Sequence, residues 1–405
     1  MVVWVQNPFD NLPSEGYRKQ RYWLMCEAFV RSGHQVVFWT SSFSHAKKKC
    51  RGLGGLEGLG GLGGLGGLEG LDVRLIPTRP YLKNICLARI RSHRAYAKEW
   101  LRLALDNRTI EHSEPSNIPA LIITSTPTLS AAAAALTIGR ALGSKVVVDV
   151  MDAWPETFER LVPKGLRWLA RPFLSGMYRT ARRLYREADL VTGVCERYRG
   201  LTGREDYYLA YHGIEGMRDA GREMGDAGRL AGSARKIRLV YAGNLGKTYD
   251  LATVVKAVEA NPDFELDVAG YGKFAYDCPR VRFHGLLSEP DLQAVLERCD
   301  VGIVPMKADS WVGVPYKFCD YSRAGLAIVS SLGGESSALL EKHRCGATYD
   351  AGDVQSLTAA IRRAMTLERG ASRTMCAAEF DARNIYDEYV ARVTSPSPCA
   401  RRSRG

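Results

Sequence analysis

The strongest constraint on the fold is a strand–helix–strand pattern within residues 299–335. Val301–Pro305 is a short, β-branched apolar run of the kind found in buried parallel strands. Pro315 suits the first turn of a helix, and the helical spacing of apolar residues after it continues to a stop at Gly325. Leu326–Ser330 then has the pattern of a second strand. Two such strands joined by a helix form a parallel sheet with a right-handed crossover, so the pattern predicts an α/β fold.

Two charged residues of this helix are candidates for binding a ligand. Lys317 and Asp320 lie three positions apart, which puts them on one helical face. The carboxylate can accept two hydroxyl groups of a sugar or ribose, and the lysine can meet a phosphate. Gly334 and Glu335, after the second strand, are predicted to line the same site. The alternative is an ordinary solvated pair on a surface helix.

The segment VPYKFCDYSRAG resembles the donor-binding motif P-x-K-x-x-E/D-Y-x-x-x-G of a subgroup of glycosyltransferase family 4. This resemblance implies the GT-B fold, with two facing Rossmann-like domains and a cleft between them. It also implies a nucleotide diphosphate sugar as substrate, with a UDP-sugar favoured, and no metal or other cofactor. The wider family has two acidic residues eight positions apart. Asp320 matches the second, whereas Val312 occupies the first position, which leaves retention or inversion of the anomeric configuration open.

Further donor-site residues are expected in the segment IRLVYAGNLGKTYD, a strand followed by a glycine-flanked turn and a helix. Backbone amides near Gly243 and Asn244 would bind a phosphate, and Lys247 would neutralise a diphosphate. The resemblance implies a basic residue at or near this last position. Gly270 follows the next strand in the same pattern. The P-loop spacing is absent.

The N-terminal half opens with another strand–helix–strand pattern. Its first loop carries Gly16, Arg18 and Arg21, which are predicted to face a ligand at the carboxyl end of a strand. A solvated basic loop is the alternative.

The strand SKVVVDV is followed directly by MDAWPETF, and relatives in the subgroup carry a similar D-x-W-P-E. The resemblance implies that Asp152 acts as a catalytic residue near the acceptor and that Glu156 lies in the cleft. Either residue could instead cap the next helix. The histidines are interpreted mostly as structural residues.

The order of these patterns predicts the domain organisation. We expect an acceptor domain over 1–212, interrupted by a glycine–leucine insertion over 52–71, and a linker over 213–236. The remaining segments are a donor domain over 237–378, a helix over 379–394 that crosses back to the first domain, and a disordered tail over 395–405.

Positive charge is concentrated in the first half of the chain. Residues 1–212 contain 30 Lys and Arg against 19 Asp and Glu, whereas residues 213–405 contain 26 against 25. Residues 164–186 mix seven basic residues with four bulky aromatic residues, as a helix at an anionic membrane surface would. The alternatives are a solvated helix with one core face and a nucleic-acid contact. Of the three, the membrane surface is the prediction, and nucleic acid is not predicted as a partner.

Other features bear on the compartment. Ten scattered cysteines without a C-x-x-C pair favour reduced thiols and give no zinc-binding spacing. VVWV at the start has the pattern of a strand, so no signal peptide is expected. No apolar run reaches the roughly 20 residues that span a bilayer. These features predict a cytoplasmic protein at the inner membrane face.

The combined prediction is a hexosyl- or N-acetylhexosaminyl-type glycosyltransferase of polysaccharide biosynthesis. It would transfer sugar, with retention, from a nucleotide diphosphate sugar to a lipid-linked or cell-surface glycan precursor. Two alternatives remain: a nucleotide-sugar 2-epimerase-like isomerase, and a non-catalytic partner subunit that binds a glycan or nucleotide.

Overall fold

The structure, a computed structural model, describes residues 1–16, 18–51, 68–84, 86–106, 118–159, 162–216, 236–246, 248–273 and 275–395. Most of the glycine–leucine insertion, most of the linker, Lys247 and nearly all of the tail lie outside these residues. The chain forms two compact units, one of Met1–Ala210 with the C-terminal segment from Arg383, and one of Tyr211–Ala382. We call them unit 1 and unit 2.

The described residues of unit 1 form a seven-stranded sheet in which all paired strands are parallel. The order is β5-β2-β1-β6-β7-β8-β9. From β1 the chain adds strands toward one edge of the sheet as far as β5 and then, from β6 on, toward the other edge, so the winding reverses between β1 and β6. The strands are β1 (Val2–Gln6), β2 (Gln35–Ser41), β5 (Leu71–Ile76), β6 (Leu121–Thr126), β7 (Lys145–Val150), β8 (Leu190–Gly193) and β9 (Tyr208–Leu209). A small antiparallel hairpin, β3 (Phe43–Ser44) with β4 (Lys49–Cys50), follows β2.

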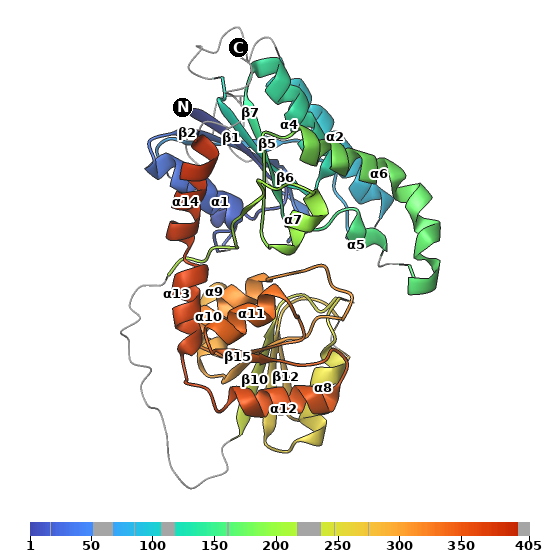
Figure 1. The fold of residues 1–405 in the computed structure, drawn as a ribbon, viewed down its shortest axis with the longest axis vertical. Helices are drawn as coiled ribbons and strands as arrows, with labels where there is room; N and C mark the ends of the chain where they lie inside the picture. The colour runs from blue at the N-terminus through green and yellow to red at the C-terminus, as the bar shows by residue number, and fades with distance from the viewer. Residues whose placement is uncertain are drawn as a thin grey trace. The chain divides into compact units, whose positions relative to one another are not determined.

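Helices cover both faces of this sheet (Figure 1). One layer contains α2, α4 and α6, which pack in sequence against one another. On the other side, α1 packs on β1, β2 and β5. The C-terminal helix α14 contacts the sheet through Tyr389, whose hydroxyl lies 3.3 Å from that of Thr192 in β8. The bounds are α1 (Arg21–Arg31), α2 (Leu87–Ala104), α4 (Leu129–Leu142), α5 (Glu156–Glu159), α6 (Arg167–Glu187), α7 (Arg197–Thr202) and α14 (Ala382–Thr394).

Unit 2 has, in the part of it that the structure describes, a six-stranded parallel sheet in the order β12-β11-β10-β13-β14-β15. Here the direction reverses between β10 and β13. Both unit orders are those of doubly wound, Rossmann-like sheets. The strands are β10 (Ile237–Ala242), β11 (Phe264–Ala269), β12 (Val281–Gly285), β13 (Val301–Val304), β14 (Ala327–Ser330) and β15 (Gly346–Thr348).

Two buried cores hold the layers of unit 2 together. Helices α9, α10, α11 and α13 contribute to the core on one face, and α8 and α12 to the core on the other. Figure 1 shows these two layers with the sheet between them. The bounds are α8 (Leu251–Ala260), α9 (Glu289–Glu297), α10 (Tyr316–Ala324), α11 (Glu335–Lys342), α12 (Val354–Ala364) and α13 (Ala371–Glu379). The predicted α/β architecture of two Rossmann-like domains is confirmed.

The strand–helix–strand unit that dominates the sequence is β13–α10–β14. Pro315 is the N-cap of α10 rather than its first helical residue, and Gly325 ends the helix with a left-handed φ of 79°. Phe318 and Tyr321 are fully buried on the sheet side of the helix. The Tyr321 hydroxyl accepts a hydrogen bond from the Ala242 amide at 2.9 Å, which fixes α10 against the end of β10. The helix is thereby held beside the point where the sheet reverses.

Candidate active site

The candidate donor site begins where β10 ends. The loop after β10 packs so closely on the loop after β11 that a Cβ on Gly270 would lie 1.8 Å from the Gly243 carbonyl oxygen. The Gly243 amide donates to the Ala269 carbonyl at 2.8 Å. The Asn244 carbonyl accepts a hydrogen bond from the Tyr241 hydroxyl at 2.5 Å. The predicted glycines therefore have a steric function, because they let the loops after β10 and β11 meet beside the reversal point, where ligands bind to doubly wound sheets.

Lys317 points from α10 to this same place. Its ammonium nitrogen lies 2.7 Å from the position that a Cβ on Gly243 would occupy. The side chain is 7% exposed, and its nitrogen lies 4.1 Å from the centre of the Tyr249 ring and 5.0 Å from that of Tyr241. Within the described residues, Lys317 has aromatic neighbours and no carboxylate partner. A buried cation without a counter-charge is suited to an anionic ligand.

Asp320 is also buried, at 7% exposure, one turn further along α10. Lys317 and Asp320 are thus not the solvated surface pair that the sequence left open. Glu335 is the first residue of α11, and one of its carboxylate oxygens accepts a 2.6 Å hydrogen bond from the Tyr211 hydroxyl. Gly334 caps that helix with a φ of 63°. The structure therefore brings Gly243, Asn244, Gly270 and Lys317 together around one loop pair, whereas Glu335 lies after β14.

Val312 occupies the position where the family motif has its first acidic residue. It is half-buried and packs against the apolar core beneath α10. Its amide donates to the Ser310 hydroxyl at 3.2 Å, and the Ser336 hydroxyl donates to the Gly313 carbonyl. The loop before α10 is thus anchored to α11, and an apolar side chain fills the place of the carboxylate.

In unit 1, Asp152 follows β7 and lies at the carboxyl edge of the sheet. Burial raises the pKa of its carboxyl group, which accepts a 3.2 Å hydrogen bond from the Thr157 hydroxyl. Glu156 begins α5, and burial together with the neighbouring Glu159 and Asp152 raises its pKa as well. One Glu156 carboxylate oxygen, Oε2, is buried without a hydrogen-bond partner in the described residues. Raised carboxyl pKa values of this kind are common at functional sites, so both groups are candidates for one.

The structure corrects the expectation for Arg21. It is the first residue of α1, fully buried, and its guanidinium forms a forked ion pair with Asp149 at 2.8 and 2.9 Å. A third hydrogen bond joins it to the Ala210 carbonyl at 2.9 Å. Arg21 therefore holds the core of unit 1 and cannot face a ligand. Gly16 and Arg18 do lie in the exposed or half-exposed loop before α1.

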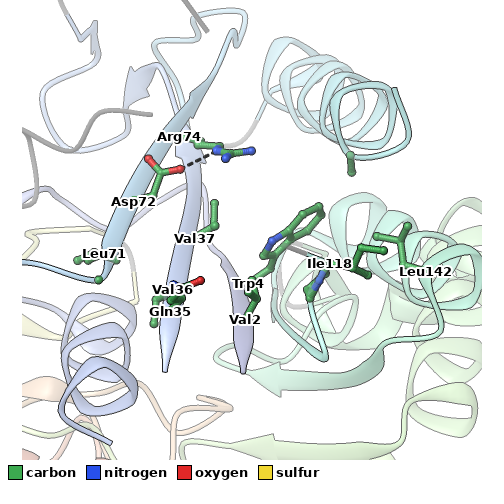
Figure 2. A pocket seen from close by; sticks show the side chains of 13 residues that line it. Val2, Trp4, Gln35, Val36, Val37, Leu71, Asp72, Arg74, Ile118 and Leu142 are labelled. Atoms are coloured by element: carbon green, nitrogen blue, oxygen red, sulfur yellow. Dashed lines mark hydrogen bonds and ion pairs between the residues drawn. The ribbon is translucent and has the colours of Figure 1, made fainter. Parts of the chain in front are cut away.

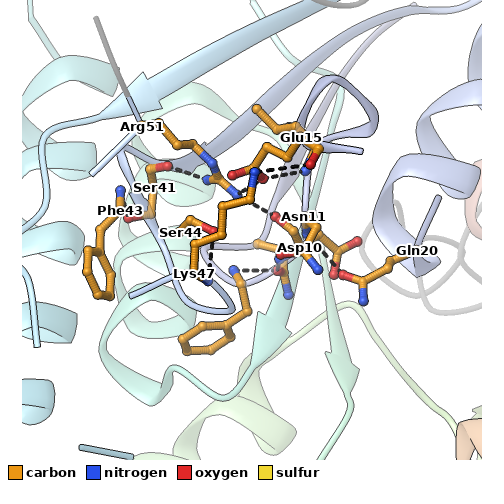
Figure 3. A network of polar contacts seen from close by, with 12 residues as sticks. Asp10, Asn11, Glu15, Gln20, Ser41, Phe43, Ser44, Lys47 and Arg51 are labelled. Atoms are coloured by element: carbon orange, nitrogen blue, oxygen red, sulfur yellow. Dashed lines mark hydrogen bonds and ion pairs between the residues drawn. The ribbon is translucent and has the colours of Figure 1, made fainter. Parts of the chain in front are cut away.

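A second arginine organises that loop. Arg51 donates to the carbonyls of Ser41 and Asp10 at 2.5 and 2.8 Å and to the Glu15 carboxylate at 3.0 Å (Figure 3). The ion pair lowers the pKa of Glu15 against the opposing effect of its burial. Burial dominates at Asp10 and raises its pKa to about 7. Figure 3 shows these side chains converging from the loop after β1 and the hairpin after β2.

Two family models match the chain. "Glycosyl transferase 4-like domain" matches residues 19–206, and "Glycosyl transferases group 1" matches residues 236–366. The first lies within unit 1 and the second within unit 2. The chain belongs to the glycosyltransferase 4-like family. No curated protein matches this glycosyltransferase in the sequence search.

Solved structures share the GT-B fold of this glycosyltransferase. Sucrose-phosphate synthase from Thermosynechococcus elongatus matches with a TM-score of 0.70 at 11% identity, over 97% of this chain and 98% of that one. HepE from Anabaena in complex with UDP matches with a TM-score of 0.63 at 13% identity, over 98% and 100%. WaaG, a glycosyltransferase involved in lipopolysaccharide biosynthesis, matches with a TM-score of 0.58 at 12% identity, over 98% and 100%. At these identities the likeness is one of fold.

Sequence reasoning missed the aromatic residues around the glycosyltransferase's buried lysine. Tyr241 is the one aromatic residue of the strand IRLVYA, and Tyr249 forms an isolated bridge to Met306 after β13. An aromatic residue at the carboxyl end of a strand whose other buried residues are aliphatic, followed by a loop that contains Lys247, was the available signal.

A cavity of about 360 Å³ lies in unit 1 at the opposite, amino-terminal edge of the sheet, and is lined by Val2, Trp4, Gln35, Asp72 and Arg74 among others (Figure 2). None of the predicted site residues lines it. Across the described ranges, no group of three or more His, Cys, Asp or Glu is arranged to hold a metal, and no helix is long and apolar enough to cross a membrane.

Proposed function

We propose that this glycosyltransferase transfers a hexosyl or N-acetylhexosaminyl group from a UDP-sugar to a lipid-linked or cell-surface glycan precursor, with retention of the anomeric configuration. The observation that carries the donor assignment is the buried ammonium of Lys317, which lies against Gly243 at the reversal point of the unit 2 sheet. The HepE structures with UDP and UDP-glucose, which share the fold, support UDP as the nucleotide.

The chemistry follows from the charges. When the bond between sugar and diphosphate breaks, negative charge develops on the leaving diphosphate. Lys317 and the backbone amides after Gly243 stabilise that charge from positions fixed before the reaction, which is the most effective form of electrostatic catalysis. Lys247 adds a second cation in this proposal. Asp320 and Glu335 bind donor hydroxyl groups, and Asp152 acts in unit 1 near the acceptor.

The membrane part of the proposal rests on the first half of α6. From Arg167 to Thr180 the helix has no fully buried residue, and Trp168 and Phe173 are 66% and 89% exposed. The buried residues of the helix, Ala181, Leu184 and Tyr185, all lie in its second half, whereas the first half contacts unit 1 through polar interactions such as the 3.5 Å ion pair between Arg171 and Glu159. Exposed aromatic residues among arginines are typical of helices that lie in an anionic bilayer surface. A lipid-linked acceptor would be presented at such a surface.

Incubation with a panel of UDP-sugars, with and without a polyprenyl diphosphate glycan or isolated membranes, tests the reaction. The proposal predicts that radiolabelled sugar enters the lipid fraction only when the acceptor is present. Conversion of the donor to an epimer without acceptor would indicate the isomerase. Tight UDP binding with neither reaction would indicate a non-catalytic subunit. NMR of the anomeric proton in the product tests retention.

Co-sedimentation with vesicles tests the membrane part separately. The double variant W168S/F173S should lose binding to vesicles that contain anionic lipid, whereas Leu286→Ser, at a residue of unit 2 that is 65% exposed, is the matched control. Raising the salt concentration should weaken the wild-type protein's binding, because the arginine contribution is screened. Equal binding of both variants would remove α6 from the proposal.

A further inference from the structure

A cluster of aromatic and basic side chains lies at the carboxyl edge of the unit 1 sheet. It is built from loops that follow different strands: Phe9 after β1, His45 in the hairpin after β2, Tyr81 after β5 and Trp154 after β7. The centre of the His45 ring lies 5.7 Å from that of Tyr81 and 5.3 Å from that of Phe9. The ring centres of Tyr81 and Phe43 are 4.9 Å apart. This is the edge of the sheet at which α/β proteins bind their substrates.

Arg89, in the first turn of α2, lies inside this cluster. Its guanidinium is 5.3 Å from the centre of the Trp154 ring and 5.4 Å from that of Phe9. Its Nε–H group donates to His93 Nε2 at 3.3 Å and its Nη1–H to the Asn84 carbonyl at 2.8 Å. All these partners are neutral. Burial lowers the pKa of Arg89 from its ordinary value, and the carboxylate that most opposes this effect is Asp152, which is not ion-paired with it.

Lys48 is the second cation of the cluster. Its ammonium lies 4.8 Å from the centre of the Tyr81 ring, which Arg89 also approaches, at 5.9 Å. It donates to the Asn84 side-chain oxygen at 2.7 Å and to His45 Nδ1 at 3.3 Å. The Lys48 backbone has a φ of 54°, a left-handed conformation that is costly for a residue with a side chain. The hairpin thus holds this lysine in a strained position beside Arg89.

The two histidines do not neutralise or add to this charge. Burial and the nearby Lys48 and Arg89 lower the pKa of His45 to about 3, and burial and Arg89 lower that of His93 to about 3. Both rings are therefore uncharged at neutral pH and accept hydrogen bonds from the cations. Burial and the charge of Arg89 lower the pKa of Lys48 to about 8. Within the residues that the structure describes, neither cation forms an ion pair with a carboxylate.

We propose that Arg89 and Lys48 form a binding site for the phosphate or diphosphate group of the acceptor. The inference rests on the proposed function, since it names the acceptor's chemical class. Two adjacent cations with neutral partners repel each other until an anion binds between them, and a planar guanidinium beside an ammonium suits phosphate oxygens. Arg89 also lies at the positive end of the α2 dipole, whose first turn has no acidic residue. The Arg89 guanidinium lies 5.3 Å from the centre of the Trp154 ring, two residues after Asp152, so a phosphate bound to Arg89 would lie in the same part of unit 1 as the proposed transfer residue.

Titration of the full-length protein with inorganic pyrophosphate tests the site directly. The donor site would also bind pyrophosphate, so the titration is run with and without saturating UDP. We expect a binding component that UDP does not displace. Arg89→Gln and Lys48→Gln should each weaken this component by about 10- to 150-fold, the range for a hydrogen bond to a charged group. Lys317→Met should leave it unchanged while it removes the component that UDP displaces.

The matched control is Arg102→Gln. This arginine lies on the same helix, is 59% exposed in its side chain and pairs with Glu99 at 2.6 Å. The variant should bind pyrophosphate like the wild type. If Arg89→Gln does not fold, Lys48→Gln still tests the site, because Lys48 lies on a half-exposed hairpin where the substitution should not disturb folding. Absence of a UDP-insensitive component, or its retention in both glutamine variants, overturns the proposal.

A kinetic comparison distinguishes an acceptor phosphate from free phosphate. With a polyprenyl diphosphate glycan as acceptor, Arg89→Gln should raise KM by about 10-fold or more. With the same glycan as an uncharged alkyl glycoside, the KM of wild type and variant should agree. Equal KM effects on both acceptors contradict the proposal. If no acceptor is glycosylated at all, the proposed function fails, whereas UDP-insensitive pyrophosphate binding still decides whether the site exists.

Discussion

Replacing Lys317 by Met should weaken UDP binding without lowering the free energy of unfolding. The ammonium is 7% exposed and has Tyr241 and Tyr249 as its charge-stabilising neighbours in the described structure. Each cation–π contact contributes about 0.5–2 kcal/mol, which offsets only part of the cost of removing a cation from water. Methionine retains the apolar stem and removes the charge, so the unliganded protein loses little and can gain stability.

The expected loss of affinity follows from the same geometry. A diphosphate bound at Gly243 would receive a hydrogen bond from Lys317, because its nitrogen reaches within 2.7 Å of the space beside that glycine. A hydrogen bond to a charged group contributes about 1.5–3 kcal/mol, which corresponds to about a 10- to 150-fold increase in Kd. Stability and affinity should therefore change in different directions, as expected for a binding residue and not for a structural one.

Isothermal titration with UDP and chemical denaturation measure the two quantities on the same samples. Lys256→Met, at an exposed position of α8, is the matched control and should change neither. Unchanged UDP affinity in Lys317→Met, with folding intact, would refute the assignment of the donor site. A fall in stability of the same size as the fall in affinity would show that the ammonium has a structural partner instead.

Three further predictions concern other residues. Gly270→Ala should destabilise the protein by about 2–5 kcal/mol in denaturant unfolding, because its Cβ would overlap the Gly243 carbonyl and its φ of 147° is unfavourable for alanine; a neutral result would disprove the close loop packing. Asp152→Asn should lower kcat while UDP affinity measured by titration stays unchanged, and wild-type turnover would exclude a catalytic role. The pKa of Asp10 is raised from 3.8 to about 7, so the folded state binds an extra proton and its stability should fall as pH rises from about 4 to 7. Asp10→Asn, which can still accept the 2.9 Å hydrogen bond from the Tyr22 amide, should reduce that slope in melting temperature; an identical slope would contradict the raised pKa.

The local patterns of the sequence were sufficient for the secondary structure around the donor site. The apolar runs predicted β13 and β14 within one residue, and Gly325 marked the end of α10. Glycines at strand ends correctly located the loop pair of Gly243 and Gly270, because close backbone approach excludes any side chain there. The burial of Lys317 could not be predicted from its charge or from its spacing in the sequence. It depends on Tyr249, a residue 68 positions away that only the folded sheet brings near.

Unit 1 illustrates the same limit. Arg21 appeared to belong to a loop facing a ligand, but its counter-ion Asp149 is 128 positions away, and no local pattern predicts such a pair. Lys48 and Arg89 come from different loops, and their proximity depends on the hairpin after β2 and the start of α2. The basic character of the segment around Arg89 was visible in the sequence, whereas the neutral state of His45 depends on burial.

The central claim is that the donor diphosphate binds in unit 2 beside Lys317. A crystal structure of the protein with UDP tests it most directly. The account predicts that phosphate oxygens lie within hydrogen-bond distance, about 2.7–3.2 Å, of Lys317 Nζ and of the backbone amides that follow Gly243. Density for UDP at any other place in the protein, with the Lys317 ammonium still enclosed by Tyr241 and Tyr249 and touching no phosphate, would contradict it.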